Sequence, residues 1–283
     1  MNHPAELAVH QYLEDASNRR STMSDETIKK ITDDIADALK RQFGSDNKDE
    51  GFRLRMSNVG RPTCQLWFQK NEPEKALPKP NTFVMNMMLG DIVEAVFKGI
   101  LTEAKVKYED SDKVTLDLGD TKISGEYDLV IDDAVDDVKS ASDWSYKNKF
   151  SSYSTLEMGD AFGYIAQLAG YAKASDKKAG GWWVVNKATG EFKYVASEID
   201  VDWEVSKIKD TVATVDRNEF KRCFTDSAET FRGKETGNRV LNINCKFCDF
   251  RKACWPELEE RPSIMSKAKQ PKIESYTQVA TNG

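Results

Sequence analysis

Two short segments of the chain combine carboxylates with a lysine. Gly125-Glu126-Tyr127-Asp128 is followed nine residues later by Asp137-Val138-Lys139. Both segments are strand-like, and residues i and i+2 of a strand project to the same face, so Asp137 and Lys139 are expected to point into one site. Carboxylates can hold Mg²⁺ or Mn²⁺ against a scissile phosphate, and a neighbouring lysine can orient the attacking water. This combination is what phosphodiester hydrolysis needs.

A plainer interpretation of the second segment is a solvated turn. Its stretch contains four aspartates: Asp132, Asp133, Asp136 and Asp137. Runs of charge usually face solvent. Taken alone, this spacing favours the turn over a metal site.

Other polar side chains fall on two expected helices. Over Thr82–Leu101, Glu94 lies on an apolar face, where an ionised carboxylate needs a partner. A metal ion would serve, and so would an i,i+4 ion pair with Lys98, worth only about 0.3 kcal/mol. On a later helix, Gln167 and Tyr171 share a face, which by itself is typical of packing.

Three of the five cysteines lie close together in the sequence. Cys245, Cys248 and Cys254 form a C-x2-C-x5-C run, and Cys64 could supply a fourth thiolate from a short helix near Pro62. Structural zinc usually takes two C-x2-C pairs, and buried, unligated thiols are the third alternative. The spacing favours an iron-sulfur cluster, while Cys223 remains unassigned.

A loop over residues 143–154 interleaves aromatic and basic side chains. These are Trp144, Tyr146, Lys147, Lys149, Phe150 and Tyr153. Such a segment can stack bases and follow phosphates of single-stranded nucleic acid. Aromatic side chains that pack back on the core are an equally good interpretation.

Three parts are expected along the chain. Residues 1–50 form an N-terminal helical extension, with an amphipathic helix over 24–43 that Ser24 caps. Residues 51–260 form the main domain, and the polar residues 261–283 form a flexible tail. Strand-like segments span 105–109, 113–118, 121–131, 134–139, 182–186 and 191–197, and helices span about 160–174 and 202–223. This order indicates an α/β fold with a mixed sheet.

Composition excludes several classes of protein. The 283 residues carry 41 Lys and Arg against 47 Asp and Glu, a net charge of −6, which counts mildly against a protein that coats nucleic acid. No apolar run approaches the roughly 18 residues of a membrane span, and the N-terminus lacks the pattern of a secretion signal. We therefore expect a cytoplasmic protein with no membrane partner.

The motifs, taken in order, resemble those of one nuclease family. A first cysteine, a helix with a metal-site residue, G-x-x-D, D-h-K, Q-x-x-x-Y and C-x2-C-x5-C follow one another between Ser57 and Trp255. This series resembles the RecB-like branch of the PD-(D/E)XK superfamily in its iron-sulfur form. CRISPR-associated iron-sulfur exonucleases and AddB-type nuclease domains are similar.

The resemblance implies a restriction-endonuclease-like core with a central mixed β-sheet, followed by a C-terminal iron-sulfur segment. It also implies a role for each matching residue. The metal ligands would be Asp128, Asp137 and the Val138 carbonyl, with Lys139 as the catalytic lysine. Gln167 and Tyr171 would contact DNA and support the site. The ligands of a 4Fe-4S cluster would be Cys64, Cys245, Cys248 and Cys254. Glu94 stands where RecB-like members usually have a metal-binding histidine, which leaves the number of bound metals open.

The implied activity is Mg²⁺- or Mn²⁺-dependent hydrolysis of DNA, by an exonuclease acting on single-stranded or resected ends. The setting would be recombination, repair or phage DNA metabolism, in the host cytoplasm for a phage protein. One alternative is a CRISPR adaptation nuclease that trims spacer precursors with an integrase partner. An alternative of another class is a catalytically inactive DNA-end-binding subunit, which the Glu94 departure favours.

Overall fold

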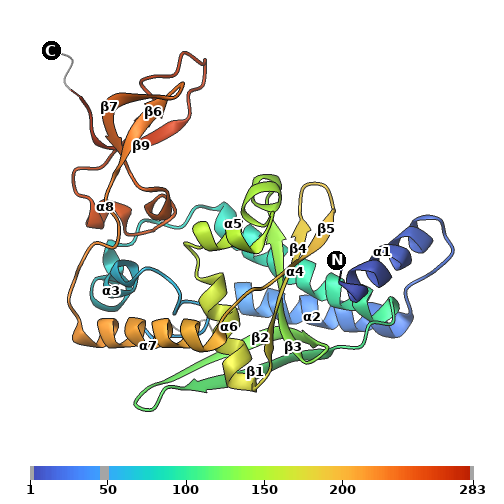
Figure 1. Cartoon of the computed structure of the whole chain (residues 1–283). Coiled ribbons are helices and arrows are strands. Elements are labelled where there is room, and N and C mark those ends of the chain that lie inside the picture. Colours follow the sequence, from blue (N-terminus) through green and yellow to red (C-terminus); the bar gives the residue numbers. More distant parts are fainter. Residues whose placement is uncertain (1–2, 45–50, 281–283) are drawn as a thin grey trace. The chain divides into compact units, whose positions relative to one another are not determined.

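The computed structural model describes residues 3–44 and 51–280 (Figure 1). The chain divides into two compact units. The first takes in the described residues up to Gly60 together with Pro80–Val212, and the second takes in Arg61–Lys79 and residues from Ala213 onward. None of the described helices is both long enough and apolar enough to cross a bilayer.

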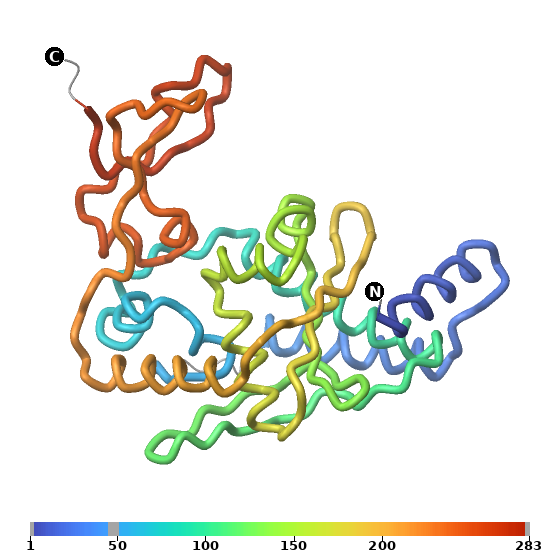
Figure 2. The backbone as a smooth tube through the Cα atoms, in the orientation of Figure 1, coloured from blue at the N-terminus to red at the C-terminus, as the bar shows by residue number. Residues whose placement is uncertain are grey.

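The first unit begins with helices α1 (Pro4–Ser17) and α2 (Asp25–Phe43). Ser24 caps α2 as expected, because its hydroxyl accepts a hydrogen bond from the Thr27 amide at 3.2 Å. α2 lies alongside α4 (Thr82–Glu103; Figure 2). Gly99 makes this approach possible, because a Cβ there would come within 2.4 Å of Ile31.

A mixed five-stranded sheet forms the centre of this unit, with the order β1-β2-β3-β4-β5. Only β3 and β4 are parallel, and the other neighbouring pairs are antiparallel. The strands are β1 (Glu109–Asp117), β2 (Lys122–Ile131), β3 (Ala134–Ala141), β4 (Lys178–Asn186) and β5 (Phe192–Ala196). The predicted α/β class and mixed sheet are therefore confirmed. The expected strand over 105–109 is wrong, because β1 is one strand that starts at Glu109.

Helices cover both faces of this sheet. α6 (Tyr164–Ser175) packs on one face, in the same apolar cluster as Trp182. α1 and α4 pack on the other, in the cluster that contains Trp183. The two tryptophans are fully buried and alternate in direction along β4, as neighbouring strand residues do. Both faces of the strand are therefore apolar, which is typical of a covered parallel pair.

The segment between β3 and α6 is helical rather than an open loop. A π-helical turn, η2 (Ser145–Lys149), is followed by α5 (Tyr153–Met158). Ser152 caps α5 in a capping box with Thr155. Helix α7 (Val201–Arg217) completes the first unit and continues into the second.

The second unit contains a four-stranded antiparallel sheet with the order β6-β7-β9-β8. Its strands are β6 (Ser227–Phe231), β7 (Lys234–Val240), β8 (Glu259–Pro262) and β9 (Ile273–Gln278). Its helices are α3 (Thr63–Asn71), α8 (Arg251–Cys254) and the 3-10 turns η1 (Pro73–Lys75) and η3 (Ile243–Cys245).

The polar C-terminal residues that were expected to form a flexible tail include strand β9 and the end of β8. β9 pairs with both β7 and β8, and its Tyr276 is only 1% exposed. The Tyr276 hydroxyl donates to buried Glu229 at 3.0 Å. The segment has few apolar residues, so its order comes from strand pairing and buried hydrogen bonds that composition does not reveal.

Candidate active site and cysteine site

The structure brings Asp128, Asp137 and Lys139 together. Asp137 and Lys139 lie on the same face of β3, and the Lys139 ammonium is 2.5 Å from Asp137 Oδ2. Asp128, on β2, accepts a hydrogen bond at 2.7 Å from the Val138 amide, which lies between them. Asp137 is 3% exposed, so the solvated-turn interpretation holds for exposed Asp132 and Asp133 but is wrong for Asp137.

The two carboxyl groups are poorly compensated. Burial raises the pKa of Asp128, and the Asp137 and Glu94 carboxylates raise it further. Burial also raises the pKa of Asp137, against the opposing effects of Lys139 and a hydrogen bond with Asp128. Burial alone would lower the pKa of Lys139, but Asp137 and Asp128 outweigh it, so the net shift is upward and the ammonium stays charged. The Lys139 ammonium thus compensates two carboxylates, buried Asp137 and partly buried Asp128.

Gln167 and Tyr171 lie beside this group on α6. The Gln167 side-chain amide donates to the Tyr171 hydroxyl at 3.2 Å. Burial raises the pKa of Tyr171 to about 12, and Asp137 and Asp128 add to this. Gly125 leaves room for the ring, because a Cβ there would come within 2.7 Å of Tyr171. The expected helix motif therefore faces the carboxylates.

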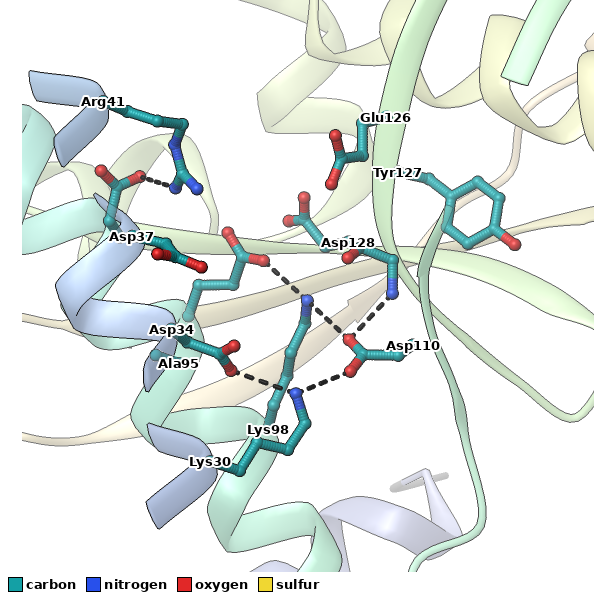
Figure 3. A pocket seen from close by; sticks show the side chains of 13 residues that line it. Lys30, Asp34, Asp37, Arg41, Ala95, Lys98, Asp110, Glu126, Tyr127 and Asp128 are labelled. Carbon is teal, nitrogen blue, oxygen red and sulfur yellow. Dashed lines mark hydrogen bonds and ion pairs between the residues drawn. The ribbon is translucent and has the colours of Figure 1, made fainter. Parts of the chain in front are cut away.

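Glu94 lines a pocket of about 380 Å³ together with Asp128 (Figure 3). The Glu94 carboxylate forms an ion pair with the Lys98 ammonium at 2.8 Å. The ion-pair alternative is therefore present in the structure. Electrostatic contact with Asp128 shows that Glu94 is also near the carboxylate pair.

The sequence did not indicate the charge network behind Glu94. Lys98, only 5% exposed, also contacts Asp110 on β1 at 3.1 Å. Asp110 in turn contacts Lys30 on α2 at 2.8 Å, as Figure 3 shows. The opposing effects of burial and of these lysines leave the pKa of Asp110 lowered to about 2. No local pattern predicts pairs that join α2, α4 and β1.

A divalent cation fits the carboxylate pair only in part. Asp137 Oδ2 is buried and has the Lys139 ammonium 2.5 Å away, so a cation at this oxygen would share it with the ammonium. Across residues 3–44 and 51–280, however, no three His, Cys, Asp or Glu side chains are arranged to hold a metal. Asp128 and Asp137 form a pair, and Glu94 would have to exchange Lys98 for the ion to become a third ligand.

The aromatic and basic segment 143–154 mostly follows the packing interpretation. Phe150 is buried, and Tyr146 and Tyr153 pack against the core. Trp144, by contrast, is 68% exposed. Lys147 pairs with the neighbouring Asp143 at 2.9 Å. The segment does not present its aromatic side chains as one exposed surface.

The four predicted cluster ligands lie within the second unit. Cys64, Cys245, Cys248 and Cys254 line one small cavity of about 20 Å³. Burial raises the pKa of the last three, and that of Cys245 reaches about 12. Four thiolates at one apolar cavity could hold an iron-sulfur centre or a zinc ion, and either would supply the positive charge that buried thiolates need. Within the part of the chain that the structure describes, however, no three of these cysteines lie close enough to hold a metal ion as placed.

Cys223 is the fifth cysteine of this unit, and the sequence left it unassigned. Its sulfur accepts a hydrogen bond from the Cys64 amide at 3.1 Å and lies 3.4 Å from the Thr63 hydroxyl. A hydrogen bond with Cys64 is the main cause that lowers the pKa of Cys223 to about 6. Cys223 does not line the cavity of the other four cysteines.

Comparisons with known proteins add little to this geometry. No protein-family model matches the chain, and no curated protein matches it. Among solved structures, the chain is similar to one titled "Crystal structure of SSO0001", from a Sulfolobus protein, with 14% sequence identity. The match covers 81% of this chain and 96% of that chain, with a TM-score of 0.41. Any functional proposal therefore depends on the motifs and the site itself.

Asp136, on the opposite face of β3, is a buried carboxyl with a structural role. It accepts hydrogen bonds from Trp183 Nε1 at 3.0 Å and from the Tyr194 hydroxyl at 2.9 Å. Burial raises the pKa of Asp136 to about 7, although these two hydrogen bonds and one with the Gly181 backbone oppose the shift. Below pH 3.8, the unfolded-state pKa, the carboxyl is protonated in both states and does not reduce stability. Above pH 7 it must be ionised while buried, so it lowers the free energy of unfolding by its full amount.

Asp136→Asn should therefore stabilise the protein increasingly as pH rises. The gain should grow between about pH 5 and pH 8 and approach about 4 kcal/mol at most. An asparagine side chain can still accept a hydrogen bond from Trp183 Nε1 and donate one to the Tyr194 hydroxyl oxygen. Urea unfolding of both proteins across this range measures the difference, and a constant difference would contradict the prediction.

Proposed function

We propose that the chain is a divalent-metal-dependent DNA nuclease acting on ends, with a restriction-endonuclease-like core of the RecB-like type. The observation that carries the proposal is the group of buried Asp137 with partly buried Asp128 and Lys139 on adjacent strands. Two desolvated carboxylates with one lysine are expensive to bury unless they have a function. A polyanionic substrate and its cations would supply the missing charge.

Each residue of the group has a part in the proposed reaction. Asp128 and Asp137, with the Val138 carbonyl and Glu94 as further candidates, would hold Mg²⁺ or Mn²⁺. A bound cation would polarise the scissile phosphate and activate water. The Lys139 ammonium would oppose the charge that develops on the phosphate oxygens. Gln167 and Tyr171 would keep the site closed on the α6 side and contact the DNA.

The cysteine site would hold a 4Fe-4S cluster with a structural role. It would join α3 to the segment that begins at Cys245, within the second unit. Biological settings for such an enzyme are recombination, repair or phage DNA metabolism. Trimming of spacer precursors beside an integrase is an alternative setting for the same chemistry.

One observation favours a second candidate, an inactive subunit that binds DNA ends. The Lys98–Glu94 ion pair at 2.8 Å occupies the carboxylate that stands in place of the usual histidine. If that pair persisted with metal present, only two acidic ligands would remain. The two candidates differ in whether DNA is hydrolysed at all.

Incubation with end-labelled linear DNA and Mn²⁺ tests the proposal. We expect label release that requires the metal, stops with EDTA and is absent from closed circular DNA. The same reaction on nicked circular DNA shows whether a nick, which has strand ends but no duplex end, is enough for hydrolysis to begin. Binding of ends without hydrolysis under any divalent metal would support the inactive subunit instead.

A further inference from the structure

Glu94 is one end of a chain of ion pairs along the pocket of about 380 Å³ (Figure 3). Its carboxylate contacts the Lys98 ammonium at 2.8 Å, and Lys98 contacts Asp110 at 3.1 Å. Asp110 contacts Lys30 at 2.8 Å, and Lys30 contacts Asp34 at 3.1 Å. The five groups alternate in sign and join α4, β1 and α2. A change at one carboxylate therefore changes which partners the next ammonium has.

This chain contains one carboxylate more than its ammonium groups can neutralise. It has three carboxylates and two ammonium groups. If Glu94 left the chain to bind a cation, two carboxylates and two ammonium groups would remain. An end of the chain can therefore leave without unbalancing the rest, and Glu94 is the end that lies near Asp128.

Lys98 needs a carboxylate partner at all times, because it is only 5% exposed. A buried ammonium that loses its partner carries a large free-energy penalty. Asp110 removes this penalty, because Lys98 would keep an Asp110 oxygen at 3.1 Å after losing Glu94. Without Asp110, the Glu94 carboxylate could leave only by stranding a buried positive charge.

The Asp110 carboxylate is held from two sides. Its Oδ1, the oxygen that contacts Lys98, also accepts a hydrogen bond from the Ser111 amide at 2.8 Å. Its Oδ2 contacts Lys30 on α2. Asp110 is therefore fixed beside Lys98 by groups other than Glu94.

We propose that Asp110 is a positioning residue for the metal site: it holds Lys98 so that the Glu94 carboxylate can bind a divalent cation together with Asp128. The role rests on the proposed nuclease function, because that function makes Glu94 and Asp128 metal ligands. Asp110 itself does not touch the cation. It acts through Lys98, which separates its role from a general effect of charge in the pocket.

Calorimetric titration of the metal-free full chain with Mn²⁺, in the absence of DNA, tests this role. Asp110→Asn removes the second partner of Lys98, so Glu94 could bind the cation only by leaving a buried ammonium unpaired. We expect the Kd for Mn²⁺ to rise about tenfold or more. Asp110→Glu keeps a carboxylate on β1 and should restore the Kd to within about threefold of the wild-type value.

Asp34→Asn is the matched control, because Asp34 lines the same pocket and the substitution removes the same charge. Asp34 contacts Lys30 rather than Lys98, so the Kd for Mn²⁺ should change by less than about twofold. Thermal melts in EDTA show that each variant is folded. Equal losses of Mn²⁺ affinity in Asp34→Asn and Asp110→Asn would assign the effect to pocket charge alone and overturn the role.

The dependence on Lys98 is tested in a Lys98→Met background. Without Lys98, the Glu94 carboxylate has no ammonium to leave, so adding Asp110→Asn should change the Kd for Mn²⁺ by less than about twofold. Such non-additivity is expected of residues that act through one contact. An equal effect of Asp110→Asn with and without Lys98 would contradict the role.

The outcomes separate the positioning role from the nuclease. If the wild type binds Mn²⁺ and cleaves DNA while Asp110→Asn binds Mn²⁺ equally well, the role of Asp110 is wrong and the nuclease stands. If Asp110→Asn weakens Mn²⁺ binding as expected but the wild type never hydrolyses DNA, the nuclease is wrong and the role stands. A wild type that binds no Mn²⁺ would overturn both.

Discussion

Asp128→Asn and Lys139→Met should each lower the rate of Mn²⁺-dependent DNA hydrolysis by about 100-fold or more. Asp128→Asn removes one of the two carboxylates that would hold the cation. Lys139→Met removes the ammonium at 2.5 Å from the other carboxylate. Asp133→Asn is the matched control, because Asp133 lies in the exposed turn before β3 and should leave the rate unchanged. The rates are measured by release of end label under single-turnover conditions.

Stability measurements distinguish this loss of activity from unfolding. The folded-state pKa of Asp128 is raised, so its ionised form costs stability at neutral and alkaline pH. Asp128→Asn removes that cost and leaves Asp137 and Lys139 as a neutral ion pair. The side-chain oxygen of an asparagine can still accept the hydrogen bond from the Val138 amide. We therefore expect a melting temperature in EDTA equal to or above that of the wild type, with the advantage increasing as pH rises.

Metal binding has its own readout in the same melts. Mn²⁺ should raise the melting temperature of the wild type, because a ligand that binds only the folded state stabilises it. The rise should be much smaller in Asp128→Asn. Full activity in Asp128→Asn or Lys139→Met, or an unchanged Mn²⁺ effect, would refute the site.

Comparison of Glu94→Gln with Lys98→Met decides the role of Glu94. If Glu94 serves only as the partner of Lys98, loss of either side chain should have a similar, small effect on the rate. If Glu94 exchanges Lys98 for a cation, Glu94→Gln should be far less active than Lys98→Met. Titration of both variants with Mn²⁺ is a second test. If Glu94 is a metal ligand, only Glu94→Gln should need a higher Mn²⁺ concentration for half-maximal activity.

Anaerobically purified protein should be brown, with broad visible absorbance and iron and sulfide in near-equal amounts. Cys248→Ser should lose most of the colour and iron, because it removes one of four sulfurs at the shared cavity. A cluster that joins Cys64 to Cys245, Cys248 and Cys254 would act as a cross-link. By the loop-closure relation, its loss lowers the free energy of unfolding by on the order of 5 kcal/mol. Limited proteolysis should therefore cut the second unit of Cys248→Ser faster than that of the wild type.

Cys223→Ser is the matched control for the cysteine site. Cys223 contacts the Cys64 amide but does not line the cavity, so the variant should keep its iron. Equal loss of iron from Cys223→Ser and Cys248→Ser would make Cys223 a ligand and revise the assignment. Colourless protein with stoichiometric zinc would reject the iron-sulfur cluster.

Several features of the protein could be predicted from local sequence because they depend on short-range geometry. Asp137 and Lys139 share a face because strand side chains repeat every two residues. Gln167 and Tyr171 meet because helix neighbours lie four residues apart. Ser24 caps α2 through its own side chain. In each case the partners are close in the chain, so their spacing alone predicts the contact.

Contacts between distant segments were decided only by the tertiary structure. The network from Glu94 through Lys98 and Asp110 to Lys30 joins two helices and a strand. The Lys149 ammonium lies nearer to the Tyr164 ring, at 4.3 Å, than to that of its sequence neighbour Phe150, at 5.9 Å. Polar β9 becomes ordered because β7 and β8 supply its hydrogen bonds. The sequence by itself determined which groups each element carries, whereas packing decided which of those groups meet, because burial and charge compensation act between elements that are far apart along the chain.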